Sequence, residues 1–272
     1  PYYISAIGCL GEGSSNNLAT DTDLALAVGT KLGDFTTGSW TNFENENFQL
    51  VSINTSRFDT TKHRATPVVS DAKVGLQELS NQLGEWKAPD SWYNNAVQEK
   101  EKWDAYVVKE SGPTNQELPS YAHAVGAVYR NADPSDIVVT AAGGLVGEVV
   151  QIWKPKELNT FETEWGFSCM GYEISGALGI KMAKPNQDVI VFVGDGSYLL
   201  QNSDIYSSIM YDKKLIIVVC DNGGHMVINR LQLAKGGKEY LCNLRSARAS
   251  NVQFVDFEAH AKSMGANAET VK

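Results

Sequence analysis

Short apolar runs alternate with helical patterns through the later part of the chain. Val and Ile dominate three segments, 136–140, 189–193 and 215–220, which lack the polar alternation of a half-exposed strand. Continuous apolar runs of this length are typical of strands buried on both faces of a parallel sheet. Residues 171–184 and 197–211 have the pattern of helices and stand before and after the middle strand. Strand, helix and strand in this order predict a βαβ unit and therefore a parallel sheet.

The first 88 residues show the same alternation. Residues 23–29 and 48–54 predict two strands, and residues 71–83 predict a helix because apolar residues recur there at helical spacing. The sequence Ala-Pro-Asp at 88–90 is typical of a boundary between domains. We therefore expect residues 1–88 to form one α/β domain.

Residues 89–272 are expected to form the second domain. Residues 92–110 and 120–130 predict two helices ahead of the first apolar strand of this region. The predicted fold class is α/β, with two doubly wound parallel-sheet domains.

Composition and charge exclude some classes of partner. The 272 residues have a formal net charge of −9, and an acidic surface repels nucleic-acid phosphates, so we expect no nucleic-acid partner. No apolar run approaches the length of a bilayer span, so we expect no membrane partner. The four cysteines contain no Cys-x-x-Cys pair, which argues against a thiolate metal site and a disulfide framework. A reducing, cytoplasmic location is the corresponding expectation.

Polar loops follow two of the predicted strands. Gly-Asp-Gly-Ser occupies 194–197 after one strand, and Asp-Asn-Gly-Gly occupies 221–224 after the next. The carboxyl ends of parallel strands are where open α/β sheets bind ligands. Asp195 and Asn222 offer oxygen ligands of the kind that Mg²⁺ prefers, and the Gly224 carbonyl could complete the set. Taken alone, Gly-Asp-Gly is usually an ordinary turn, but the strands, the helix and the spacing here all favour a cofactor site.

This pattern resembles the motif of the thiamine-diphosphate enzymes, in which Gly-Asp-Gly is followed at this spacing by Asn. The resemblance implies thiamine diphosphate and Mg²⁺ as cofactors, with the metal held by Asp195, the Asn222 side chain and the Gly224 carbonyl. It also implies that Gly196 and Ser197 contact the diphosphate.

The run Gly-Phe-Ser-Cys-Met-Gly at 166–171 is a second match. In similar enzymes a bulky apolar residue at the position of Met170 presses under the thiazolium ring, and Ser168 belongs to the same cofactor-binding loop. The alternative is that Met170 fills a gap in the core. His225 and Met226 depart from the family pattern, and we do not assign His225 as a metal ligand because Mg²⁺ prefers oxygen.

Three stretches, 27–40, 164–173 and 228–232, resemble one member family, the trihydroxycyclohexanedione hydrolases of inositol catabolism. The likeness is weaker from Gln232 to Asn251, where the chain looks shortened. It implies hydrolysis of a carbon–carbon bond in a cyclic 1,2-dione, giving 5-deoxyglucuronate, by an enzyme that is a homodimer or homotetramer. Trp40, Glu173 and the pair Asn229 and Arg230 have ordinary structural explanations as well, a core aromatic, a solvated helix residue and a surface turn, so none is assigned a catalytic role.

The resemblance also implies that something is absent from this sequence. In the superfamily a Glu of the pyrimidine-binding domain activates the cofactor, and no part of the chain resembles that domain. The chain is expected to hold part of the middle domain, at 1–88, and a C-terminally truncated diphosphate-binding domain, at 89–272. We therefore name no catalytic residue and expect the chain alone to be inactive. Two alternatives remain: an enzyme related to acetohydroxyacid synthases or decarboxylases, and a non-catalytic relative that binds the cofactor.

Overall fold

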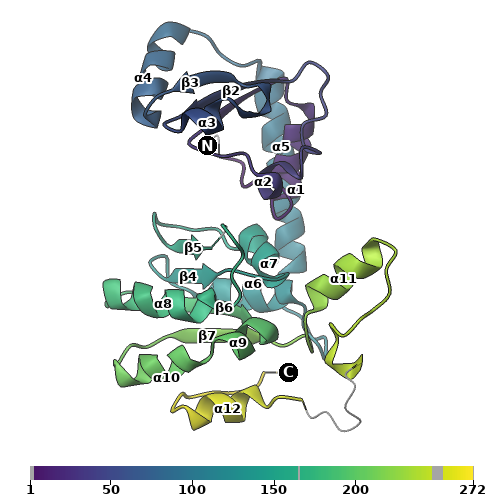
Figure 1. Ribbon diagram of the computed structural model, residues 1–272, viewed down its shortest axis with the longest axis vertical. Coiled ribbons are helices and arrows are strands. Elements are labelled where there is room, and N and C mark those ends of the chain that lie inside the picture. Colours follow the sequence, from purple (N-terminus) through teal and green to yellow (C-terminus); the bar gives the residue numbers. More distant parts are fainter. Residues whose placement is uncertain (1–2, 165, 247–253, 272) are drawn as a thin grey trace. The chain divides into compact units, whose positions relative to one another are not determined.

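The computed structural model describes residues 3–164, 166–246 and 254–271. It contains two compact units, Pro1–Lys109 and Glu110–Lys272, each built on its own parallel sheet (Figure 1). Trp165, which belongs to one of the stretches that resemble the hydrolase family, lies outside the described residues. The end of the segment from Gln232 to Asn251, where the likeness is weaker, lies outside them as well.

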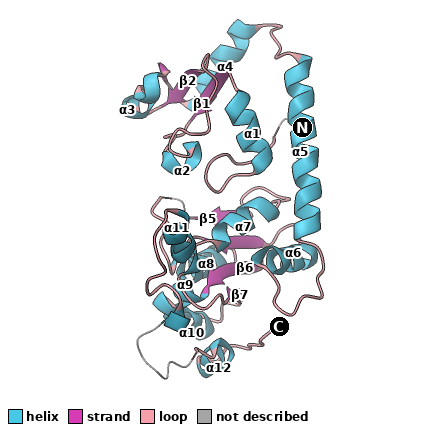
Figure 2. Ribbon diagram, turned by 90° about the vertical axis from the view of Figure 1, so that its right-hand side faces the viewer, coloured by secondary structure: helices cyan, strands magenta, loops and turns pink. Residues whose placement is uncertain are grey.

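The division between the units differs from the boundary expected at 88/89. Helix α5 (Asp90–Glu110) is a single long helix (Figure 2), and it packs against α1 (Gly13–Asp21) of the first unit. A Cβ atom on Gly13 would lie 2.9 Å from the Trp103 ring, so only glycine allows this close approach. The Asn17 amide also donates a hydrogen bond of 2.7 Å to Glu99. These contacts group α5 with the residues that precede it.

The first unit contains a three-stranded parallel sheet in the order β1-β2-β3. The two predicted strands are confirmed, whereas β3 was not expected because Pro67 interrupts its pattern. Proline is tolerated there because β3 pairs only with β2. The elements are β1 (Leu24–Val28), α2 (Asp34–Thr37), β2 (Gln49–Asn54), α3 (Arg57–Thr60), β3 (Thr66–Val69) and α4 (Ala72–Leu83).

The second unit contains a four-stranded sheet in the order β5-β4-β6-β7, with every pair parallel. The three strands predicted from their apolar runs are therefore neighbours, as expected. The described elements are α6 (Tyr121–Asn131), β4 (Ile137–Thr140), α7 (Leu145–Ile152), β5 (Phe161–Thr163), α8 (Tyr172–Ala183), β6 (Val189–Gly194), α9 (Asp195–Leu200), α10 (Ser203–Met210), β7 (Ile216–Cys220), α11 (Met226–Ala234) and α12 (Phe257–Ser263).

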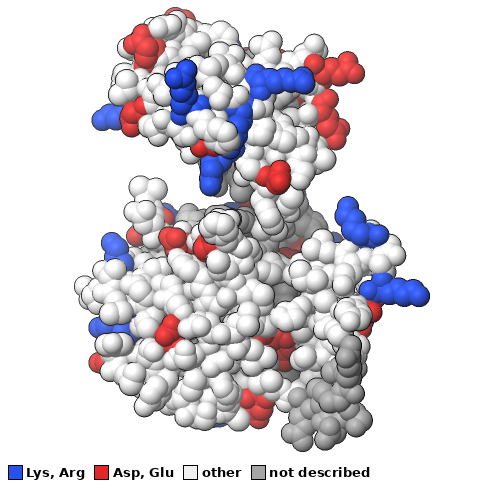
Figure 3. All heavy atoms as spheres, viewed as in Figure 1, with Lys and Arg blue, Asp and Glu red and all other residues white. Residues whose placement is uncertain are grey.

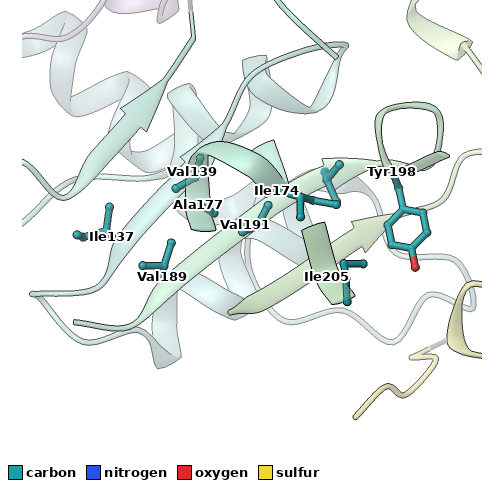
Figure 4. Close-up of a cluster of buried hydrophobic side chains, with 9 residues drawn as sticks. Ile137, Val139, Ile174, Ala177, Val189, Val191, Tyr198 and Ile205 are labelled. Carbon is teal, nitrogen blue, oxygen red and sulfur yellow. The ribbon is translucent and has the colours of Figure 1, made fainter. Parts of the chain in front are cut away.

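Alternate residues of the strands pack against helices on opposite faces of this sheet. On one face, strand residues such as Val139 and Val191 contact residues of α8, α9 and α10 in a single buried cluster (Figure 4). On the other face, the buried Phe192 meets Trp153, at the end of α7, edge to face at 6.0 Å, and Trp153 meets Tyr129 of α6. Helices on both faces confirm the doubly wound architecture.

The helix predicted over 197–211 is wrong in its details. The chain becomes helical at Asp195, and the helix breaks after Leu200, so α9 and α10 are separate. At the break, the Asn202 side chain donates a hydrogen bond to the Tyr198 carbonyl and competes with the helical backbone. The Gly-Asp-Gly segment thus forms the junction between β6 and a short helix of six residues.

Acidic and basic side chains are interspersed on the face of the second unit shown in Figure 3. Among the helices built from described residues, none is both long and apolar enough to cross a bilayer. All four cysteines are free, with Cys9 and Cys169 exposed and Cys220 buried.

Candidate functional site

The loops that follow β6 and β7 meet at the carboxyl edge of the second sheet. Asp195 is the first residue of α9 and is only 3% exposed. Its Oδ2 atom accepts a hydrogen bond of 2.7 Å from the Gly224 amide. The same amide donates to Oδ1 of Asn222 at 3.2 Å. The two side-chain oxygens predicted to bind a metal therefore converge on one point. In the sequence, 26 residues lie between Asp195 and Asn222, and they include α10 and β7.

The Gly224 carbonyl oxygen accepts no hydrogen bond from any other described residue. The neighbouring backbone groups are used differently, because the His225 amide donates to Cys242 and the Leu244 amide donates to Gly223. These two bonds fix the chain on either side of Gly224. The third predicted metal ligand is thus held in place with a free acceptor.

Tyr121 fixes the orientation of Asn222. The Asn222 Nδ2 atom donates a hydrogen bond to the Tyr121 hydroxyl, so Oδ1 is the atom left to face Gly224 and Asp195. Tyr121 is the first residue of α6, and 101 positions in the sequence separate it from Asn222. No local signal in the sequence connects the start of that helix with the proposed metal-binding loop, so this residue could not be found from the sequence.

Gly196 leaves space for two side chains above the turn. A Cβ atom at this position would lie 2.9 Å from Cε1 and Nδ1 of His225 and 3.2 Å from Cε of Met170. The structure therefore brings together Gly196, Met170 and the unexpected His225. Met170 remains 37% exposed, which distinguishes it from a residue that merely fills the core.

A carboxylate shapes the loop that carries Ser168 and Met170. Glu164 accepts hydrogen bonds of 2.8 Å from the amides of Phe167 and Cys169. These backbone hydrogen bonds hold the pKa of Glu164 below its usual value. Between the two anchored amides, Ser168 is exposed and has a left-handed backbone with φ of 53°.

Glu173 is completely buried, at 0% exposed. The structural explanation of Glu173 as a solvated helix residue is therefore wrong. Its two carboxylate oxygens accept hydrogen bonds from Gly171, at 2.8 Å, and from Ala142, at 3.3 Å. Burial raises the pKa of Glu173, while these bonds and one from the Ser197 side chain act in the opposite direction. Ser197 is buried as well.

The charge on Asp195 is destabilised in the absence of a cation. Burial raises the pKa of the Asp195 carboxyl, and the nearby Asp221 carboxylate adds to this effect. The hydrogen bond from the Gly224 amide partly offsets both. A bound cation would stabilise the ionised form of Asp195, because an opposite charge at close range favours ionisation.

The donor set suits a hard cation that shares its coordination with a phosphate. No cluster of three or more His, Cys, Asp or Glu side chains suited to a metal occurs in the part of the chain that the structure describes. Asp195, the Asn222 amide oxygen and the Gly224 carbonyl instead offer three oxygens of mixed type. Mg²⁺ is commonly held by few protein ligands together with substrate phosphates and water. The residues present therefore fit a Mg²⁺–diphosphate group.

Comparison with known sequence families agrees with this chemistry. Residues 1–79 match the central domain of thiamine pyrophosphate enzymes, and residues 141–272 match their C-terminal TPP-binding domain. Thiamine pyrophosphate is another name for thiamine diphosphate. The second match includes all seven residues that the sequence analysis placed at the cofactor: Ser168, Met170, Asp195, Gly196, Ser197, Asn222 and Gly224.

Several curated relatives share one enzyme name. Proteins named 3D-(3,5/4)-trihydroxycyclohexane-1,2-dione hydrolase from Lacticaseibacillus casei and Halalkalibacterium halodurans are 34% and 33% identical to the chain, and each alignment covers 98% of it. A protein of the same name from Geobacillus thermodenitrificans is 32% identical over the whole chain. The chain spans 45% to 46% of the length of these relatives.

Two matched domains, the convergent oxygens of Asp195 and Asn222, and extended similarity to these proteins lead to one assignment. The chain belongs to the thiamine pyrophosphate enzymes and carries sequence of both their central domain and their C-terminal cofactor-binding domain.

Proposed function

We propose that this chain is the central and diphosphate-binding part of an enzyme that hydrolyses a carbon–carbon bond of a cyclic 1,2-dione. The observation that carries this proposal is similarity of 32% to 34% along almost the entire chain to relatives named for that reaction. The same region holds the convergent Asp195 and Asn222. We propose trihydroxycyclohexanedione as the substrate and 5-deoxyglucuronate as the product.

The residues of the second unit have separate roles in this proposal. Asp195, Asn222 and the Gly224 carbonyl would hold Mg²⁺, and Gly196 and Ser197 would contact the diphosphate. Met170 would support the thiazolium ring, consistent with its partial exposure beside Gly196. Bound at this site, thiamine diphosphate would supply a carbon nucleophile and an electron sink for the cleavage. The residue that activates the cofactor would belong to the pyrimidine-binding domain of the whole enzyme.

The metal site is tested by calorimetric titration of the chain with thiamine diphosphate, with Mg²⁺ and with a chelator. We expect binding only with Mg²⁺, and we expect Asp195→Asn to abolish it because the substitution removes the only carboxylate of the ligand set. Asp188→Asn is the matched control, since Asp188 immediately precedes the opposite end of β6 and is partly exposed. Equal binding by wild type and Asp195→Asn would show that the metal is held elsewhere.

The reaction is tested in a chimera. The chain would replace the matching central and C-terminal segments of the L. casei relative, and purified chimera would be assayed on the cyclic dione and, separately, on pyruvate. We expect ring opening of the dione and no decarboxylation of pyruvate. The reverse result would favour the acetohydroxyacid synthase and decarboxylase group, and cofactor binding without either activity would favour a non-catalytic relative.

A further inference from the structure

Glu173 is a buried charged residue of the second unit that neither the metal site nor the matched motif explains. It lies in the first turn of α8 and has no exposed surface. Burying an ionisable group without compensation is costly, so a buried carboxylate is expected to have specific partners. Its partners come from three different loops.

Each of these loops belongs to the candidate cofactor site or borders it. The Gly171 amide donates to Oε2 and directly follows Met170 in the sequence. The Ala142 amide donates to Oε1 from the loop between β4 and α7. The Ser197 side chain, in the first turn of α9, supplies a further hydrogen bond. One carboxylate therefore connects the loop of Met170, the end of β4 and the turn that contains Gly196.

A side chain with two oxygen atoms suits these donors. A carboxylate has two oxygens that both accept hydrogen bonds, whereas a Gln side chain has one accepting oxygen and one NH₂ group that can only donate. A Gln at position 173 would place its NH₂ group against a backbone amide and leave that amide without an acceptor. An acidic side chain is therefore favoured at this position because it can place an accepting oxygen opposite each amide.

We propose that Glu173 is a positioning residue of the cofactor site, which acts by holding Met170 and Ser197 at the separation that bound thiamine diphosphate requires. The proposal rests on the proposed cofactor site of this chain and adds to it a residue that does not touch the cofactor. Glu173 acts on Met170 through the Gly171 amide and on the diphosphate through Ser197. Its loss lowers cofactor affinity beyond any effect on folding.

The test compares Glu173→Gln with Lys181→Gln. Lys181 is the matched control because it is a buried charged residue of the same helix, and it donates its hydrogen bond to Gln187, away from the three loops. Dissociation constants for thiamine diphosphate with Mg²⁺ are measured by calorimetry well below each melting temperature. We expect Glu173→Gln to weaken binding about tenfold or more, in the range for hydrogen bonds to a charged group. Lys181→Gln should lower the melting temperature and leave the affinity within about twofold.

A double substitution separates positioning from general destabilisation. If Glu173 acts through Ser197, the affinity losses of Glu173→Gln and Ser197→Ala are not additive, because each removes the same interaction. Should Glu173→Gln fail to fold, Glu173→Asp takes its place. It keeps the charge but is one methylene shorter, so it cannot reach all three donors, and the same loss of affinity is expected from a folded protein.

The outcomes distinguish this proposal from the function on which it rests. If wild type binds the cofactor and both Glu173 variants bind it equally well, the positioning role is wrong and the cofactor site stands. Strict additivity with Ser197→Ala would likewise overturn the route through Ser197. Failure of wild type itself to bind thiamine diphosphate with Mg²⁺ would overturn the proposed function and the positioning role together.

Discussion

At the scale of single residues, the oxygens proposed to bind the metal depend on side chains that are not themselves proposed ligands. Tyr121 accepts a hydrogen bond from the Asn222 amide and so directs the other end of that amide toward Asp195. Burial raises the pKa of Tyr121 and keeps its hydroxyl neutral at physiological pH. Affinity for the proposed metal should therefore depend partly on α6, a helix that contributes no proposed ligand.

Tyr121→Phe is expected to weaken Mg²⁺-dependent binding of thiamine diphosphate by roughly threefold to tenfold, the range for one net hydrogen bond. The substitution keeps the ring but lets the Asn222 amide rotate. Affinity would be measured by calorimetry at several Mg²⁺ concentrations. Tyr129→Phe on the same helix is the control, since the Tyr129 hydroxyl bonds to the Lys154 carbonyl. The same affinity in wild type and Tyr121→Phe would show that Tyr121 has no part in orienting Asn222.

At the scale of elements, the loop from Glu164 to Gly171 depends on a carboxylate at its start. The hydrogen bonds from Phe167 and Cys169 lower the pKa of Glu164 from a reference value of 4.5. A depressed pKa in the folded state means that the stabilisation is fully present above about pH 4.5 and is lost as the pH falls through the lower folded value. The loop that carries Met170 should therefore loosen in acid.

The direction of this pH dependence can be checked by NMR. The amide signals of Phe167 and Cys169 should shift in a pH titration with a midpoint below 4.5, and Glu164→Gln should remove the transition. Because Glu164 is partly exposed and anchors only a loop, the effect should be local and global unfolding should not accompany it. A midpoint above 4.5 would contradict the anchoring role of this carboxylate.

The sheet of the second unit is stabilised on the face opposite α8 by aromatic side chains that meet edge to face. Phe192 is fully buried and contacts Trp153, which in turn contacts Tyr129. Phe192→Ala is expected to reduce the free energy of unfolding of this unit by about 3–5 kcal/mol, the usual range for a buried aromatic residue. Chemical denaturation would measure it. Phe167→Ala is the control because Phe167 is 90% exposed, and a comparable loss there would contradict the assignment of the core.

At the scale of the whole molecule, two units with separate sheets match two domains of one enzyme family. The diphosphate end of the cofactor would be held by the second unit, whereas the activating Glu is expected in a domain that matches neither part of this chain. The isolated chain should therefore bind the cofactor without catalysing the reaction. The isolated chain is expected to bind thiamine diphosphate weakly with Mg²⁺ and to show no hydrolysis of the cyclic dione.

A hydrolysis assay run beside the calorimetric titration tests whether the chain binds the cofactor without hydrolysing the dione. The full-length L. casei relative serves as the positive control for the dione substrate. Ring opening by the isolated chain, abolished by Asp195→Asn, would show that the activating acid lies within these 272 residues and that its expected location is wrong.

Local patterns in the sequence were enough to predict part of the fold and of the candidate site. Apolar runs at 189–193 and 215–220 identified buried parallel strands, and the polar residues that end them marked the edge where Asp195 and Asn222 meet. Alternation with helices predicts parallel strands, and consecutive parallel strands are usually neighbours, so the convergence of these oxygens could be predicted without coordinates. Pro67 hid a strand because local propensity does not reveal that β3 lies at an edge of the sheet.

Which distant residues support that site depends on tertiary packing and could not be predicted from local patterns. Tyr121 reaches Asn222 across 101 positions, and Glu173 receives amides and a hydroxyl from three loops. The same applies to α5, which belongs with the first unit because Trp103 packs on Gly13. Helical or strand periodicity shows which side of an element is apolar, but not which neighbour it meets. Side-chain partners depend on how the elements pack together, and that packing results from the summed burial of many residues far apart in the chain.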